Sequence, residues 1–138
     1  MTTEAAIAFL EQRQPMPSDF DISKEECDTF VAILKQFESA PDVRIAPFLI
    51  GAVGPETGLG MYEDIRFVLM RLPKEEVIPH LLTALKSTSA EVQARCCWWA
   101  CDIEAWTLRG EIAALVSLAD EDVRFAASTF LEAHDEKA

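Results

Sequence analysis

The chain has 138 residues, of which 12 are Lys or Arg and 24 are Asp or Glu, so its formal net charge is −12 at pH 7. Half of the residues are hydrophobic and 26% are charged, a balance typical of one folded domain and not of a disordered chain. The acidic excess argues against binding to the phosphate backbone of nucleic acids and to anionic membranes, because both depend on Lys and Arg. A basic protein would instead be attracted at long range.

The first residues, Met1–Glu4, contain no positive segment followed by an apolar run, so they predict no targeting signal. No apolar stretch approaches the ~18 residues that span a bilayer. We therefore expect a cytoplasmic protein. Four cysteines, Cys27, Cys96, Cys97 and Cys101, fit no disulfide framework, because adjacent Cys96 and Cys97 point in different directions. We expect reduced thiols.

The chain reads as helices and turns, without a convincing strand. A first helix is predicted over residues 3–14 and ends before Pro15 and Pro17, since proline lacks the N–H and clashes with the preceding turn. A second begins at the capping box Ser23–Glu26 and continues to about Ser39, with apolar residues at helical spacing.

A third helix is predicted from Pro41–Asp42 to Val53, and Gly54–Pro55 ends it with a left-handed C-cap at the glycine. The glycines between 51 and 60 resemble a phosphate-binding loop only superficially. No strand precedes them and no Gly-Lys-Ser/Thr follows them, so a linker between two helices is the favoured interpretation.

An internal repeat begins in this third helix. Residues 45–53 match residues 77–85 at a shift of 32, with proline on proline, and match residues 108–116 more weakly at a further shift of 31. In the weaker copy, Gly110 replaces the proline.

An apolar stripe of five positions repeats in the same way in the second helix of each unit. The three copies are Met61, Ile65, Val68, Leu69 and Leu72; Val92, Cys96, Trp99, Ala100 and Ile103; and Val123, Ala127, Phe130, Leu131 and His134. Each unit is therefore predicted to be two helices, neither of which buries its stripe alone, so that stacking is required.

Residues 77–85 resemble the first helix of a HEAT repeat, and Asp120–Ala127 resembles the acidic turn and the Val-Arg start of the second. The chain departs from the family pattern at Gln93 and Gly110. The resemblance implies an all-α, right-handed HEAT-like solenoid of three helix pairs. We expect a single domain over residues 1–138, with capping helices in 1–41, or a degenerate extra unit there, and repeats in 42–138.

The sequence offers only weak candidates for catalytic or metal-binding groups. The carboxylate pairs are sequence neighbours at helix starts and surfaces, where acids favour the helix dipole, and do not converge across a cleft. His80 and His134 lie in different units, and Cys97 and Cys101 have no CxxC or HxxxH companion, so small half-buried thiols are favoured over a metal site. We expect no catalytic residues, no metal and no cofactor.

One set of residues predicts a binding surface. On the side opposite the apolar stripe, which should face water, the second helices also carry apolar side chains, and acidic residues border them. In a solenoid this side often lines the concave surface, so the pattern predicts a protein-binding surface. The apolar members are Phe67, Met70, Trp98 and Phe125, and the acidic members are Glu63, Asp64, Glu91 and Asp102. The competing interpretation is that curvature, a loop or a homodimer covers these side chains.

The architecture and charge are similar to those of small bacterial HEAT-like immunity proteins. This similarity implies a non-catalytic inhibitor that covers the active site of a basic toxin, such as a nuclease domain. Two alternatives stay open: a HEAT-like scaffold or assembly factor, acting as an adaptor or lyase-type subunit, and a nucleic-acid-processing enzyme of the DNA-glycosylase kind. The acidic composition disfavours the enzyme, which needs a basic groove.

Overall fold

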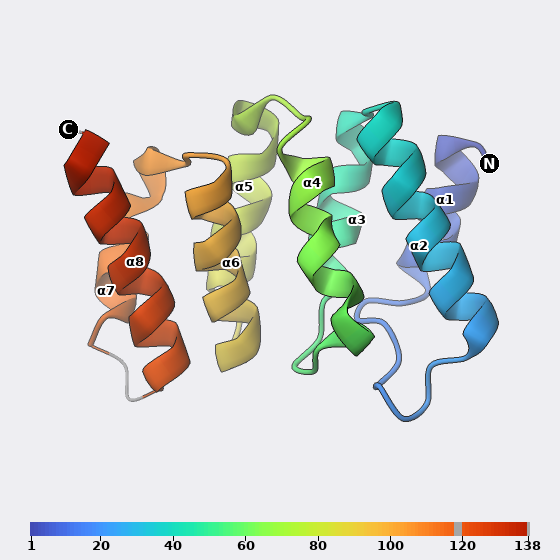
Figure 1. Cartoon of the computed structure of the whole chain (residues 1–138), viewed down its shortest axis with the longest axis horizontal. Coiled ribbons are helices and arrows are strands. Elements are labelled where there is room, and N and C mark those ends of the chain that lie inside the picture. Colours follow the sequence, from blue (N-terminus) through green and yellow to red (C-terminus); the bar gives the residue numbers. More distant parts are fainter. Residues whose placement is uncertain (118–119, 138) are drawn as a thin grey trace. The chain divides into compact units, whose positions relative to one another are not determined.

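The computed structural model describes residues 1–117 and 120–137, and these contain helices and turns but no strand, as the sequence predicts. The chain divides into two compact units, Met1–Pro73 and Lys74–Ala138 (Figure 1). Within the described ranges, no helix combines the length and apolar character needed to cross a bilayer.

The first unit begins with two capped helices. Helix α1 (Thr3–Glu11) is capped by the Thr2 hydroxyl, and it ends earlier than residue 14, three residues short of the predicted end. Helix α2 (Lys24–Ser39) begins at the predicted capping box, in which Ser23 accepts from the Glu26 amide and Glu26 accepts from the Ser23 amide. Two orphan amides at the helix start are satisfied in this way.

The third predicted helix is shorter than expected and has a different start. The 3-10 turn η1 (Val43–Ile45) comes first, with the Asp42 carboxylate accepting from the Arg44 amide, and α3 (Ala46–Gly51) follows. The expected left-handed C-cap at Gly54 is wrong, because α3 ends at Gly51 and its C-cap residue, Ala52, has a right-handed conformation. The glycines with positive φ are Gly58 and Gly60.

Those two glycines begin a kinked segment. The 3-10 segment η2 (Gly58–Asp64) contains left-handed residues and leads into the short helix α4 (Ile65–Leu69), so the second helix of this repeat is half as long as the stripe predicts. A side chain on Gly58 would meet the buried Tyr62 ring, since an added Cβ would lie 2.5 Å from Tyr62 Cζ. The Tyr62 ring packs edge-on against Phe30, with ring centroids 6.0 Å apart.

The helices of the first unit pack in two rows. Helix α1 packs against α3, while α2 packs against α4, and α3 also contacts α4 (Figure 1). The buried side chains that fill this core are Ala6, Leu10, Phe30, Ile33, Phe37, Leu49, Tyr62, Ile65, Val68 and Leu69. Burial of this apolar area is the dominant favourable contribution to folding.

The second unit contains two helix pairs. Its helices are α5 (Lys74–Leu85), α6 (Ala90–Asp102), the 3-10 turn η3 (Trp106–Leu108), α7 (Arg109–Leu115) and α8 (Glu121–Lys137). Ser89 caps α6 by accepting from the Val92 amide, and Asp120 caps α8 by accepting from the Val123 amide at 3.0 Å. The predicted acidic turn is therefore a helix cap.

Helix α6 packs along α5 and along α8, and α7 packs against α8 (Figure 1). The repeated stripe lies in this core, because Cys96, Trp99 and Ala100 of α6 are buried together with Val123, Ala127 and Phe130 of α8. The half-buried ring of Trp106 packs on Phe130, with centroids 5.1 Å apart, and its edge meets His134. Trp106 therefore has a packing role within the second unit.

Replacing Gly58 tests the turn before α4. Gly58→Ala is expected to lower the free energy of unfolding by about 2–4 kcal/mol. The alanine would have to adopt the left-handed backbone conformation of Gly58, and its methyl group would collide with the Tyr62 ring. Gly60→Ala, with φ +87 and nothing near its Cβ, is expected to lower it by only about 1 kcal/mol. Urea unfolding measures both, and equal losses would contradict the steric role of Tyr62.

Acid is expected to weaken the junction between α1 and η1. The Arg44 guanidinium, donating to Asp42 at 2.7 Å, holds the pKa of Asp42 well below its usual range, with help from the Arg44 amide and the Thr3 hydroxyl. Because folding depresses the pKa of Asp42, the ionised carboxylate stabilises the folded state. This stabilisation is fully present above the unfolded-state pKa of about 4 and is lost as the pH falls. Asp42→Asn should therefore flatten the loss of stability in acid.

The matched control for that substitution is Glu11→Gln. Among the described residues, the Glu11 carboxylate makes no hydrogen bond or ion pair, so its replacement should leave the pH dependence of unfolding as in the parent chain. Urea unfolding between pH 7 and about pH 3 compares the two variants. An Asp42→Asn curve parallel to that of the parent would refute the role of Asp42.

Candidate functional site

The first-unit members of the predicted surface lie on and around α4. Ile65, Val68 and Leu69 are buried, whereas Phe67 is 38% exposed and Met70 is 53% exposed. The helical spacing therefore separates a buried stripe from an apolar surface, as the sequence predicts for these side chains. Glu63 and Asp64 are also exposed, in the 3-10 segment that precedes α4.

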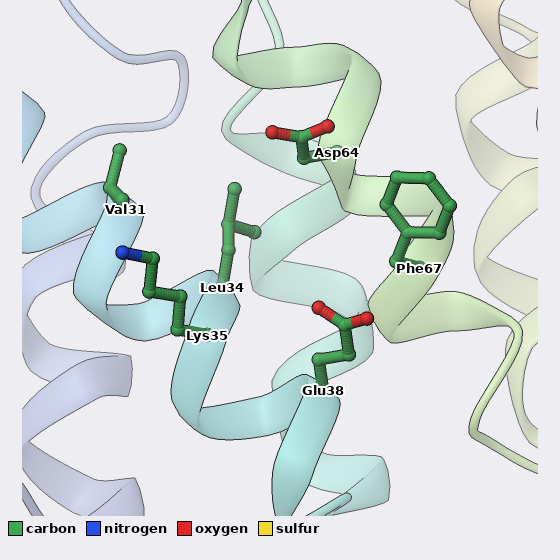
Figure 2. A pocket seen from close by; sticks show the side chains of 6 residues that line it. All are labelled: Val31, Leu34, Lys35, Glu38, Asp64 and Phe67. Carbon is green, nitrogen blue, oxygen red and sulfur yellow. The ribbon is translucent and has the colours of Figure 1, made fainter.

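Phe67 and Asp64 border a shallow cavity of about 300 Å³ between α2 and α4. Figure 2 shows Asp64 and Phe67 on one side and the side chains of α2 on the other. The α2 residues that complete the lining are Val31, Leu34, Lys35 and Glu38. The volume is at the small end of the ~300–1,000 Å³ typical of ligand pockets, so it suits one inserted side chain better than a cofactor.

The charges at this cavity are mixed. Asp64 and Glu38 are acidic, Lys35 is basic, and among the described residues none of the three makes an ion pair. The guanidinium of Arg66 lies over the Phe67 ring, 4.7 Å from its centroid. A cation over an aromatic face is a favourable electrostatic contact, so Arg66 lies against one face of the Phe67 ring.

The second-unit members form a closer cluster. Trp98 of α6 and Phe125 of α8 contact each other, with ring centroids 5.8 Å apart at an interplanar angle of 60°. Trp98 is 37% exposed and Phe125 is 67% exposed. These rings lie at the surface of their unit, where two neighbouring helices present them as one aromatic pair. Sequence spacing alone did not show that the two side chains meet.

Acids border this aromatic pair along the helices. Glu91 is exposed in the first turn of α6, and half-buried Asp102 is its last residue, four positions after Trp98. On α8, Glu121 and Asp122 precede Phe125 by four and three positions, so they share its side of the helix. These two acids were recognised from sequence only as part of a helix cap.

The cysteines of α6 have the environment of packing residues. Cys96 and Cys97 are buried, and burial raises the pKa of Cys97 to about 12 and also raises that of Cys96. Burial, together with Asp102 and Glu104, raises the pKa of half-buried Cys101. All three therefore remain thiols at neutral pH, whereas a nucleophile or metal ligand needs the thiolate.

The candidate metal-ligating and acid–base groups do not converge. Among residues 1–117 and 120–137, no group of three or more His, Cys, Asp or Glu side chains is placed to hold a metal ion. The carboxylate pair Glu25 and Glu26 lies in the first turn of α2, where Glu26 serves the capping box and accepts from Arg13 at 2.7 Å. His134 packs against Trp106 at the surface of the second unit.

No known protein family, curated protein or solved structure matches this chain.

The two phenylalanines of α8 provide a direct test of which aromatic residues belong to the core. Phe130→Ala should lower the free energy of unfolding by about 3–5 kcal/mol, because its ring is fully buried. Phe125→Ala should lower it by less than about 1 kcal/mol, since Phe125 is 67% exposed and loses mainly its tilted ring contact with Trp98. Urea unfolding distinguishes them, and a large loss for Phe125→Ala would place Phe125 in the core.

Proposed function

We propose that this chain is a non-catalytic protein-binding module that inhibits a basic protein, in the manner of an immunity or antitoxin protein acting on a toxin nuclease domain. The observation that supports this most directly is the exposed Trp98–Phe125 pair among acids. Aromatic side chains are enriched at the centres of protein interfaces and are the usual binding hot spots. A net charge of −12 complements a cleft built to bind phosphates.

The architecture in this proposal is a HEAT-like solenoid of three helix pairs. Its support is the repeat of about 31 residues in the sequence, together with the pairing of α5 with α6 and of α7 with α8 inside the second unit. Stacked pairs leave one face of each second helix free of the core, and that face carries the aromatic side chains. Phe67 of α4 and Met70, directly after it, are proposed to contact the partner from the first unit.

In the proposed mechanism, attraction comes first and occlusion follows. Glu63, Asp64, Glu91 and Asp102 contribute to a field that accelerates encounter with a positively charged partner. Burial of Trp98 and its aromatic neighbours then slows dissociation, because apolar area leaves water. The partner's substrate, a polyanion, is excluded from the cleft that the acids occupy.

The partner is identified by capture from the native host with the full chain, followed by purification of the captured protein. We expect a protein with a basic domain of pI above about 9 whose nuclease activity is lost when the chain is added. The association rate should fall at least about tenfold between low and high salt, because steering is screened. An acidic partner, or full activity in the complex, would contradict the proposal.

Substitutions then locate the surface. Trp98→Ala should raise the Kd at least ~30-fold, equivalent to about 2 kcal/mol, if Trp98 is a hot spot. Val43→Ala is the control, since Val43 is 39% exposed, lies in η1 and is outside the predicted surface. Both variants must keep the helical circular dichroism of the parent. A Trp98→Ala change as small as that of Val43→Ala would remove Trp98 from the interface.

A further inference from the structure

The most exposed large apolar side chain that the structure describes is Phe20, in the segment between α1 and α2. Phe20 is 94% exposed, whereas the other exposed aromatic residues keep part of their rings covered. Single apolar residues on a protein surface are ordinary and need no explanation. Phe20 differs because its backbone is held in place, because acids flank it in the chain and because Ser18 of the same turn lines a cavity.

The turn that carries Phe20 is fastened to residues 56–58. The Asp19 amide donates to Glu56 Oε2 at 2.6 Å. In return, the Asp19 carboxylate accepts from the Thr57 hydroxyl at 2.8 Å and from the Gly58 amide at 2.9 Å. These three bonds join segments nearly forty residues apart, so the residue before Phe20 is fixed from both its backbone and its side chain.

The residues after Phe20 are held as well. The Ser18 carbonyl accepts from the amides of Asp21 and Ile22 at 3.0 and 2.9 Å, and the Ser18 hydroxyl donates to the Asp21 carboxylate at 3.0 Å. Phe20 is thus presented by an ordered turn while its own ring remains in water. An ordered presentation reduces the conformational entropy that binding would otherwise cost.

The surroundings of Phe20 are acidic and partly hollow. Asp19 and Asp21 are the chain neighbours of Phe20, and Glu56 accepts from the Asp19 amide. The bases at the two ends of the segment between α1 and α2, Arg13 and Lys24, pair with Glu26 and Asp28. Pro17, Ser18 and Glu56 line a cavity of about 250 Å³ together with Tyr62. A partner that covers Phe20 would therefore meet negative charge, and the cavity that Ser18 lines belongs to the same turn.

We propose that Phe20 is a preorganised anchor that inserts into an apolar pocket with a basic rim on the partner protein. The three flanking carboxylates specify the sign of that rim. They also disfavour a second copy of this chain as the occupant, because each copy carries a net charge of −12 and would bring the same acids to the contact. The proposal rests on the proposed function for the class of partner, but it adds a contact made by the first unit alone.

The first experiment places a photoreactive benzoylphenylalanine at position 20 of the full chain, expressed in the native host, and a second such chain carries it at position 43 as the control. We expect position 20 to crosslink to the basic protein captured by the parent chain, and position 43 not to do so. Crosslinking to a second copy, to an acidic protein or to nothing would overturn the proposal.

The second experiment measures affinity for that purified partner. Phe20→Ala should raise the Kd at least ~30-fold through faster dissociation, and Phe20→Leu should recover part of this loss because it keeps apolar volume. The free energy of unfolding should not change, because the exposed ring contributes little to the core. A Kd equal to that of the parent would overturn the proposal.

A parallel measurement with Trp98→Ala keeps the two proposals distinguishable. If Trp98→Ala weakens binding while Phe20→Ala does not, the proposed function stands and the anchor is refuted. If Phe20→Ala alone weakens binding to a basic partner, the anchor stands and the Trp98–Phe125 surface is refuted. If the partner proves to be acidic, both are refuted.

Discussion

The fold depends on burying one apolar stripe from each helix. None of the longer helices is apolar all round, and each packs its stripe against neighbours in its own unit: α2 against α4, and α6 against α5 and α8. The buried positions Phe30, Leu69, Trp99 and Phe130 are the consequence. Because each helix meets this demand mainly with one side, side chains on the other side, such as Trp98 and Phe125, stay partly exposed. The aromatic residues found there are the ones that need another explanation.

Electrostatics separates the residues that stabilise the fold from those on the proposed binding surface. Arg44 of η1 pairs with Glu4 of α1 as well as with Asp42 beside it, and Arg13, just after α1, pairs with Glu26 of α2. These ion pairs join α1 and its C-terminal turn to their neighbours. Near Trp98 and Phe125, the four acids Glu91, Asp102, Glu121 and Asp122 outnumber the two bases Arg95 and Arg124. This excess of like charge works against the stability of the isolated chain. Such an excess is useful to a protein whose partner supplies the opposite charge. It also limits self-association through the same surface.

Two kinds of exposed aromatic residue illustrate different ways to prepare a binding contact. Trp98 and Phe125 are presented by long helices whose buried faces fix their orientation. Phe20 is presented by a turn in which hydrogen bonds through Asp19 replace a packed face. In both cases ordering is completed on folding, so less conformational entropy is lost on association. The guanidinium of Arg66 lies over the Phe67 ring, so this ring is less available to contact a partner.

The sequence by itself determined the helical class, the capping box at Ser23 and the alternation of buried and exposed positions, because these follow from local chemistry and helical period. The sequence predictions were wrong where packing between distant segments decides the structure. Helix α1 ends early, the left-handed glycines are Gly58 and Gly60 and not Gly54, and a kinked 3-10 segment that contains buried Tyr62 precedes α4. Only the tertiary structure brought Trp98 onto Phe125 and tied Asp19 to residues 56–58. Contacts between residues so distant in the chain leave no periodic signal, since they depend on how helices and turns meet in space.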